Sequence, residues 1–211
     1  MTIPGTDSII DLSHWNTVQD FSLVKQSGVS AILHKASQGL VADPSYASHR
    51  AQAASAGLLN GAYHFGVASQ DPVEQTDFFL QTVLANKNPL VGQSPKAGVL
   101  ALDWEWNNAD TMQPLYAAAF IQRIFHQTGR WPILYTSSAF LEGFPLLDPD
   151  GAFAQCELWL TGFTKGPNVP PPWSTWRIWQ HGIGTWPGIS GQVDRDMFNG
   201  TPAAIEAFFR A

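Results

Sequence analysis

The sequence predicts a single-domain α/β barrel of eight strands, irregular over its last third. Over residues 8–137, short apolar strands alternate with helical stretches, which is typical of a parallel sheet. Eight strand candidates suit closure into a barrel. The last three are separated by loops too short for good helices. The length of 211 residues fits one domain with its own core, and neither a repeat nor a low-complexity linker divides it. We therefore expect one domain spanning residues 1–211.

Each strand candidate is a short apolar run that ends near polar or turn residues. The first five alternate with helices and cover residues 8–13, 31–37, 60–65, 99–106 and 132–137. The last three cover residues 158–163, 176–181 and 193–198. A loop rich in Pro and Gly at 165–172 separates the first of these from the second.

The helix candidates show start and stop signals. The first covers residues 21–28 and ends at Gly28, and the last covers residues 202–210. Three others have a polar N-cap candidate, and two of these end at a glycine. They run from Asp43 and Pro44 to Gly57, from Asp71 to about residue 85, and from Asp110 or Thr111 to Gly129.

The composition excludes several kinds of partner. Only 13% of the residues are charged, and the formal net charge is −6. Binding to nucleic acid depends on Lys and Arg that neutralise phosphates, so an acidic chain argues against it. The same balance argues against a basic membrane-surface helix, and no apolar run approaches the ~20 residues of a membrane span. We expect neither nucleic-acid binding nor membrane insertion.

The N-terminal segment lacks a basic stretch followed by an apolar one, so we expect no classical signal peptide. The chain contains one cysteine, Cys156, which excludes an internal disulfide framework. Because Cys156 lies beside an apolar strand, we expect a buried structural thiol. The six histidines show no HExxH spacing, so a zinc site is not indicated. These features predict synthesis in a reducing cytosol.

Polar side chains lie near the ends of the predicted strands. In a parallel β/α barrel, functional groups lie at the carboxyl ends of the strands. Parallel strands are covered on both faces, so charges inside them are not explained as a solvated face. We expect a site among the polar residues at these ends, which are Asp11, Lys35, Tyr63, His64, Asp103, Glu105, Tyr135, Gln180, His181, Asp194 and Asp196.

The sharpest candidate is the pair Asp103 and Glu105. Alternate residues of a strand share one face, so both carboxylates are expected to point the same way, about 6–7 Å apart at the backbone. The other face would place Leu102, Trp104 and Trp106 in the core. Two close carboxylates do not both ionise easily in a dry site, so one becomes a general acid, as glycoside hydrolysis requires. The alternative is a structural carboxylate pair bonded to Lys35 or Arg195.

Two weaker alternatives concern ligands. Asp11, Asp103, Glu105 and Asp194 offer oxygen ligands for a hard cation, but the calcium-loop spacing is missing. The chain also contains nine Trp, against roughly three on ordinary usage. Tryptophan fills cores and also stacks on the apolar faces of sugar rings, and both interpretations stay open.

Eight motifs in order resemble one known family. They are DLSHWN at Asp11, HKASQG around Lys35, GAYHF at Gly61, LALDWEW at Leu100, PILYTS at Pro132, LWLTGF at Leu158, WRIWQH at Trp176 and GQVDRDMFNG at Gly191. Together they resemble glycoside hydrolase family 25, the Chalaropsis-type lysozymes or N-acetylmuramidases. The resemblance covers residues from about 7 to 210. It implies an irregular (β/α)5(β)3 barrel that hydrolyses the β-1,4 bond from N-acetylmuramic acid to N-acetylglucosamine in peptidoglycan.

The resemblance also implies roles for site residues. Glu105 matches the general acid/base. Asp103 matches the partner carboxylate, which either orients the 2-acetamido group of the substrate in an assisted mechanism or acts more directly. Asp11 and Asp194 match the two further acids. The positions expected to bind substrate are Lys35, Tyr63, Tyr135 and Gln180. No metal or organic cofactor is implied.

The sequence departs from the family pattern at four positions. Gln38 replaces a common Glu, Asp196 a common Asn, His181 the usual Tyr and Phe163 a common Tyr. We expect these differences to affect subsites and the pH optimum more than activity. An extra acid at Asp196 would raise the pKa of a neighbour if it faces the site.

Two rival functions remain. Family-18 chitinases also have a strand ending in DxE, but their motif has a further Asp where this chain has Ala101. A non-catalytic glycan-binding or inhibitor protein on the same scaffold typically lacks the acid, and Glu105 is present.

The expected partners are peptidoglycan glycan strands, with an immunity protein if the chain is an exported effector, and we expect a monomer. A phage endolysin, an exported effector and an isolated domain all remain open, each acting on the wall in the periplasm or outside the cell.

Overall fold

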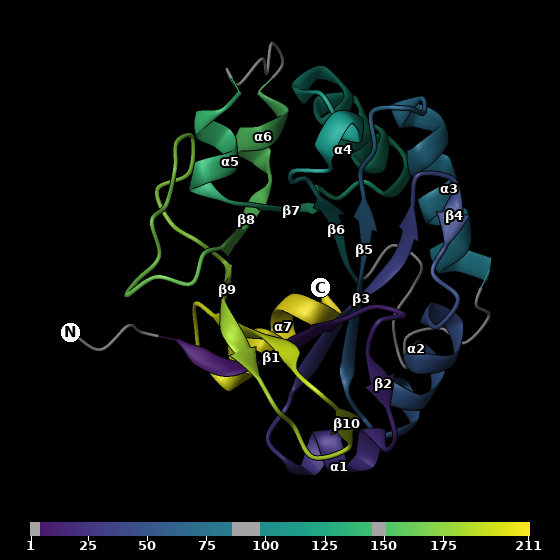
Figure 1. Cartoon of the computed structure of the whole chain (residues 1–211), viewed down its shortest axis with the longest axis vertical. Coiled ribbons are helices and arrows are strands. Elements are labelled where there is room, and N and C mark those ends of the chain that lie inside the picture. The colour runs from purple at the N-terminus through teal and green to yellow at the C-terminus, as the bar shows by residue number, and fades with distance from the viewer. Residues whose placement is uncertain (1–4, 86–97, 145–150) are drawn as a thin grey trace.

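The computed structural model describes residues 5–85, 98–144 and 151–211. The first four residues of the N-terminal segment discussed above lie outside this part. Within it, eight strands close into a barrel (Figure 1). In chain order these are β1 (Thr6–Leu12), β3 (Ala31–Gln38), β5 (Leu59–Phe65), β6 (Val99–Asp103), β7 (Ile133–Thr136), β8 (Glu157–Thr161), β9 (Ile178–Gly184) and β11 (Val193–Phe198). The predicted fold class is confirmed.

The strand directions explain the irregular last third of the barrel. Every neighbouring pair from β1 through β3, β5, β6, β7 and β8 to β9 is parallel. Strand β11 closes the ring between β9 and β1 and is antiparallel to both. A short connection between consecutive strands permits only an antiparallel neighbour, whereas a parallel one requires a crossover.

Helices cover the outside of the ring in Figure 1. The longer ones are α2 (Tyr46–Ser55), α3 (Pro72–Ala85) and α4 (Pro114–Thr128). Shorter elements lie between strands: α1 (Phe21–Gln26), the 3-10 turn η1 (Asn108–Asp110), α5 (Ser138–Glu142) and α6 (Ala152–Gln155). Three two-residue strands complete the structure: β2 (Thr17–Val18), β4 (Val41–Ala42) and β10 (Ile189–Ser190).

The final helix α7 (Pro202–Arg210) fills one end of the barrel. Its Ile205 and Phe209 are fully buried, and they pack in one cluster with Ile9 of β1 and Phe198 of β11. The same cluster also contains aromatic side chains of the strands, including Trp159 of β8. The barrel interior is therefore apolar at the α7 end, which leaves the other end for polar groups.

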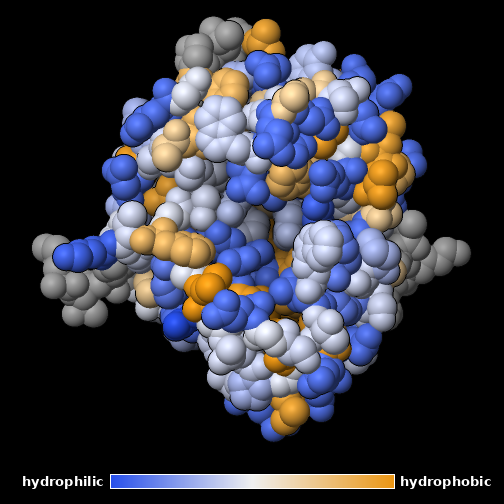
Figure 2. All heavy atoms as spheres, viewed as in Figure 1, coloured by the Kyte–Doolittle hydropathy of each residue, from blue (hydrophilic) through white to orange (hydrophobic). Residues whose placement is uncertain are grey.

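Figure 2 shows the same view as a surface. Hydrophilic side chains border a hollow near the centre of this face, over the middle of the ring of strands, and hydrophobic atoms lie deeper. No helix in the described residues is long and apolar enough to cross a membrane.

Several predicted helix boundaries were wrong by a few residues. The helix predicted from Asp43 begins at Tyr46, because the Asp43 carboxylate accepts hydrogen bonds from the backbone N–H of Ser45 and His14. The helix predicted from Asp110 or Thr111 begins at Pro114, because Asp110 lies in η1 and caps the backbone of Ser69 instead.

Other boundary predictions are confirmed. The carboxylate of Asp71 accepts hydrogen bonds from the N–H groups of Val73 and Glu74, at 2.8 and 3.1 Å, and so caps the first turn of α3. Gly129 ends α4 with φ of 74°, a left-handed conformation that favours glycine. Cys156 is buried, as expected of a structural thiol.

Candidate active site

Four carboxyl groups meet at the end of the barrel opposite α7. Asp11 lies near the end of β1, Asp103 is the last residue of β6, and Glu105 follows two residues later. Asp194 is the second residue of β11. Because β11 runs opposite to its neighbours, its start lies beside the ends of the parallel strands, and Asp194 pairs directly with Asp11. The structure thus brings together the predicted acids.

The geometry predicted for the DxE pair was wrong in one respect. Strand β6 ends at Asp103, where the backbone N–H of Trp104 donates the last hydrogen bond to Tyr135 of β7. Beyond this point strand alternation no longer determines orientation. Trp104 is buried as predicted, and its indole N–H donates to the carbonyl of Met112 at 2.8 Å. Trp106, predicted to lie in the core, is 57% exposed and packs one side against Phe140.

The two carboxyls of the pair therefore differ in environment. Asp103 is buried, and its Oδ1 has no hydrogen-bond partner among the described residues. Burial raises the pKa of Asp103 well above its usual range. The charge of Glu105 raises it further, whereas Lys35 lowers it. Buried polar atoms are normally paired, so an unpaired oxygen at the mouth of a barrel is available to a ligand N–H or O–H group.

Glu105 is only partly buried and can reach a bound molecule. Burial raises its pKa above the usual value of a glutamate, and the charge of Asp194 acts in the same direction, while Lys35 opposes both. A carboxyl with a raised pKa and access to solvent fits a general acid.

A hydrogen-bond network fixes the side chain of Asp11. The Gln180 side chain of β9 donates to Asp11 Oδ2 at 2.9 Å. The Oε1 of Gln180 accepts from the hydroxyls of Tyr135 at 2.9 Å and Thr161 at 2.7 Å. All of Gln180, Tyr135 and Asp11 are buried. Gln180, predicted to bind substrate, is therefore placed where it orients a carboxylate.

Asp11 titrates unusually. Burial and the neighbouring charge of Asp194 raise its pKa to about 7, although hydrogen bonds from Gln180 and from Asp196 act against this rise. Burial also raises the pKa of Asp194 itself. The added acid Asp196 faces the barrel interior, where it is fully buried, and its pKa is raised well above the usual range by burial and then by Asp11.

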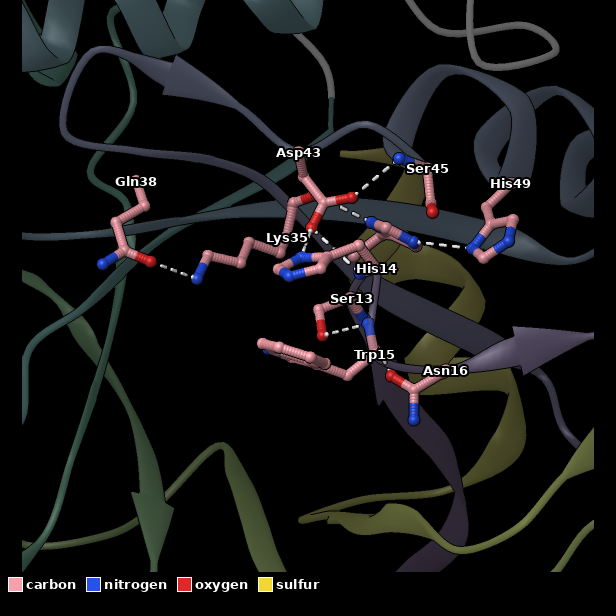
Figure 3. Close-up of polar contacts among 10 residues, drawn as sticks. Ser13, His14, Trp15, Asn16, Lys35, Gln38, Asp43, Ser45 and His49 are labelled. Carbon is pink, nitrogen blue, oxygen red and sulfur yellow. Dashed lines mark hydrogen bonds and ion pairs between the residues drawn. The ribbon is translucent and has the colours of Figure 1, made fainter.

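Lys35 supplies positive charge beside these acids. Its Nζ donates to Gln38 Oε1 at 2.6 Å (Figure 3). The same atom lies 4.8 Å from the centre of the Phe65 ring. Burial lowers its pKa, and the charge of Asp103 counteracts this effect. Arg195 pairs with Asp7 instead. Among the described residues, neither cation hydrogen-bonds Asp103 or Glu105, so the alternative of a structural carboxylate pair is not supported.

The loop after β1 is held rigidly beside Lys35. His14 donates its backbone N–H to Asp43 at 2.9 Å, and its ring Nδ1 lies 2.8 Å from the same Oδ2. The Asn16 side chain accepts from the N–H of Ser13 at 2.8 Å. Figure 3 shows these contacts around Trp15, which is 82% exposed and lies against the His14 ring with centroids 4.5 Å apart.

The remaining predicted residues divide between the two faces of the barrel wall. Tyr63 is buried in the interior beside Trp159, and its pKa is raised well above 10 by burial and by Asp11. His64 faces the helices, where it contacts Ser37 at 2.8 Å and Gln75 at 3.2 Å.

His181 also lies outside the cluster. Its Nε2 is 3.4 Å from Asp7 Oδ1. Neither His64 nor His181 therefore belongs to the site. This result agrees with their sequence neighbours Tyr63 and Gln180 pointing inward, because adjacent residues of a strand point to opposite faces.

Sequence reasoning missed four residues around the site. Trp159 and Thr161 are two positions apart on β8 and therefore share one face of the strand, so the period of two could have indicated them. The contact between His14 and Asp43 joins residues 29 positions apart, and no local pattern indicated it. Within the described ranges, no group of three or more His, Cys, Asp or Glu side chains is arranged to hold a metal ion.

The chain is similar to known proteins over most of its length. Residues 10–185 match the family described as Glycosyl hydrolases family 25. A relative from Streptomyces globisporus, "Lysozyme M1", is 28% identical over 210 residues, which cover 94% of this chain and 69% of the relative.

Solved structures agree. The bacterial lysozyme from Streptomyces coelicolor superposes with a TM-score of 0.81 at 26% identity, and the match covers 99% of this chain and 98% of that one. A family GH25 lysozyme from Aspergillus fumigatus gives a TM-score of 0.77 at 26% identity, with 97% and 99% covered.

Proposed function

This chain belongs to glycosyl hydrolase family 25, and from this premise we propose that Glu105 and Asp103 cleave the muramic acid linkage of peptidoglycan. The protein is a glycoside hydrolase of the lysozyme class. The single observation that supports the assignment of residues is the contrast between the pair. Glu105 is accessible and has a raised pKa, whereas Asp103 is buried with an unpaired oxygen.

In the proposed reaction, protonated Glu105 donates its proton to the glycosidic oxygen as the bond from C1 of the muramic acid residue breaks. The oxygen of the neighbouring 2-acetamido group attacks C1 and closes a positively charged ring. The unpaired oxygen of Asp103 accepts a hydrogen bond from the acetamido N–H, and the negative charge of Asp103 stabilises the positively charged ring. Glu105, now a carboxylate, takes a proton from water, and the water oxygen bonds C1 and reopens the ring.

The surrounding acids support this division of roles. Asp194 raises the pKa of Glu105 and so helps it to hold a proton. Asp11, fixed by Gln180, adds negative charge where an oxocarbenium-like transition state develops positive charge. Lys35 lies close enough to lower the pKa of both carboxyls, which favours the anionic form of Asp103 against the effect of burial.

Exposed aromatic side chains support a glycan as the substrate. Trp15 follows β1 and Trp106 follows Glu105, so the two flank the acids from different strands, and both are more than half exposed. A large exposed aromatic ring leaves apolar surface in contact with water, and stacking on the apolar face of a sugar ring would cover that surface.

The test is a digest of purified peptidoglycan, reduced with borohydride and analysed by mass spectrometry. We expect new reducing ends on muramic acid. Ends on glucosamine would contradict the linkage, and the absence of products would favour a non-catalytic glycan-binding protein. An early-time NMR measurement of the released anomer distinguishes retention, which the acetamido mechanism requires, from inversion.

The matched variants are Glu105→Gln and Glu142→Gln. Both remove one carboxylate, but Glu142 is exposed on α5, and its charge is not among the causes that shift the pKa values of the four acids. We expect Glu105→Gln to fold normally and to lose on the order of 100-fold or more in kcat. Full activity of Glu105→Gln, or equal losses in both variants, would contradict the role of Glu105.

The cellular setting is a further part of the proposal. We propose that the enzyme meets peptidoglycan in the periplasm or outside the cell, after release or dedicated export. A monomeric state and an immunity protein stay predictions, which size-exclusion chromatography with light scattering and a pull-down from the producing cells would test.

A further inference from the structure

Asp196 is a carboxyl that the proposed mechanism does not use. It lies on β11 two residues after Asp194, and its side chain is fully buried in the barrel. The indole N–H of Trp159 donates to its Oδ1 at 2.7 Å. Its Oδ2 has no N–H or O–H donor among the described residues. A buried carboxylate with one unsatisfied oxygen is costly, so the group requires another partner.

That partner is the carboxyl of Asp11. The ladder between β1 and β11 pairs Asp194 with Asp11 and Asp196 with Ile9, so Asp196 and Asp11 are diagonal neighbours on the inner face of the barrel. Each of the two carboxyls affects the pKa of the other. Two carboxylates repel each other and have no proton to share, so a hydrogen bond between them requires one of the two groups to be protonated.

The environment decides which group holds the proton. Asp11 receives a second hydrogen bond from Gln180 at 2.9 Å and is slightly exposed at the mouth, and both features stabilise its anion. Asp196 has one neutral donor, Trp159, and no exposure. The charged form is therefore less costly at Asp11, and the proton belongs to Asp196.

The other groups around Asp196 reinforce this distribution. On its own strand lies Asp194, and on β1 lies Asp11, so both charged neighbours oppose a further negative charge. On β8 the neighbour is the indole of Trp159, and on β9 the paired residue is Gln180, and neither titrates. None of these contacts brings a cation that would favour ionised Asp196.

We propose that Asp196 is a positioning residue that keeps its proton at neutral pH and donates it in a hydrogen bond to Asp11, which orients Asp11 and favours its anionic form at the substrate. This inference deepens the proposed function and rests on it for its consequence in catalysis. Asp196 itself does not touch the substrate. It acts through Asp11, together with Gln180 on the other side of that carboxylate.

The test compares Asp196→Asn with Asp196→Leu. An Asn side chain donates to Asp11 through its NH2 group and accepts from Trp159, so we expect it to retain kcat close to that of the wild type. Leu is similar in size but donates nothing. We expect Asp196→Leu to lose on the order of 100-fold in kcat. In this variant the acid limb of the pH profile should also move to higher pH, because Asp11 ionises less readily.

Two readouts do not need activity and separate this inference from the proposed function. Infrared spectra at pH 7 should show a stronger carbonyl stretch of protonated carboxyls in the wild type than in Asp196→Asn, because the variant lacks one protonated carboxyl. The Asn variant should also melt at a higher temperature than the wild type at pH 8, and the difference should shrink towards pH 4. In the unfolded wild type Asp196 has its ordinary pKa of 3.8 and loses its proton above that pH. This ionisation increasingly favours the unfolded wild type as the pH rises, and Asp196→Asn lacks it.

The outcomes are distinct. If Asp196→Asn loses as much activity as Asp196→Leu while both fold, Asp196 acts as a carboxylate and the inference is wrong. If the infrared band is the same in the wild type and Asp196→Asn, the proton is not on Asp196, and the inference is also wrong. If Glu105→Gln stays active while the infrared and melting differences appear, the proposed function fails and the protonated Asp196 stands.

Discussion

At the scale of residues, one strand end separates the two carboxylates of the DxE motif. Asp103 is the last residue in the ladder between β6 and β7, so it points into the barrel and is buried. Glu105 follows after the ladder ends and reaches solvent. The same two-residue spacing that predicts equivalent neighbours on a strand here produces two groups with different environments. This difference favours an acid and an electrostatic partner.

Lys35 is predicted to set the lower pH limit of activity. Its positive charge lowers the pKa of both Asp103 and Glu105. In Lys35→Gln both pKa values rise, so we expect the acid limb of the kcat/KM profile to move to higher pH. The alkaline limb, where Glu105 loses its proton, should move in the same direction.

The control for this prediction is Lys25→Gln. Lys25 lies exposed in the last turn of α1, so this variant changes the net charge equally without touching the site. A profile measured from about pH 4 to pH 9 checks both variants. Identical limbs in Lys35→Gln and the wild type would show that Lys35 does not act on the carboxyls.

At the scale of elements, the direction of β11 assembles the site. Six of the seven other strands are followed by a connection that returns the chain for a parallel neighbour, and their carboxyl ends carry Asp11 and Asp103. Strand β11 follows β9 after residues 185–192, which contain only the two-residue strand β10, and it runs in the opposite direction. Its first residues, and not its last, therefore reach the mouth, and Asp194 meets Asp11.

The end of α4 gives a prediction that concerns stability and not activity. Gly129 has φ of 74°, and a Cβ built there meets no atom within 4 Å. The cost of Gly129→Ala is therefore conformational, and we expect the free energy of unfolding to fall by about 1–2 kcal/mol. Urea unfolding followed by circular dichroism measures it.

The matched substitution is Gly162→Ala. A Cβ at Gly162 also meets no atom within 4 Å, but its φ lies outside the left-handed region. We expect this variant to match the wild type within about 0.5 kcal/mol. Equal stability of both variants would mean that the left-handed conformation at Gly129 contributes nothing.

At the scale of the whole molecule, the site lowers stability at alkaline pH. Asp11, Asp103, Glu105, Asp194 and Asp196 all have raised pKa values in the fold. Each binds its proton more tightly folded than unfolded, so the folded state holds more protons and stability decreases as pH rises. This is the cost of gathering acids in a buried site.

We therefore expect the free energy of unfolding to rise as the pH falls from 9 to 7. At pH 8 and above His34 and His64, whose pKa values burial lowers from 6.5 to about 4, are almost entirely neutral in both states and add almost no slope. Below pH 6.5 they act in the opposite direction, because the unfolded chain takes up protons there.

Urea unfolding at pH 7, 8 and 9 checks the slope, and Asp103→Asn should reduce it. Glu142→Gln, which removes an exposed carboxylate on α5, serves as the comparison. Stability that stays constant or falls between pH 9 and 7 would be inconsistent with buried protonated carboxyls.

The sequence by itself determined the class of fold and most of the candidate site. Apolar runs separated by helical periods predicted eight strands, and the polar residues near the ends of these strands, among them Asp11, Lys35, Tyr63 and Tyr135, were the candidates for the site. These features are local, because a strand and the polar residues near its end are recognised from neighbouring positions of the chain.

Only the tertiary structure decided what lies opposite each of these residues. It ended β6 at Asp103, reversed β11, and brought Asp196 against Asp11 and Asp43 against His14. Such contacts depend on which strands pair and where the barrel closes, and closure is a property of all eight strands together. The chemistry of the acids depends on these neighbours, because burial and nearby charge, not residue type, set their pKa values.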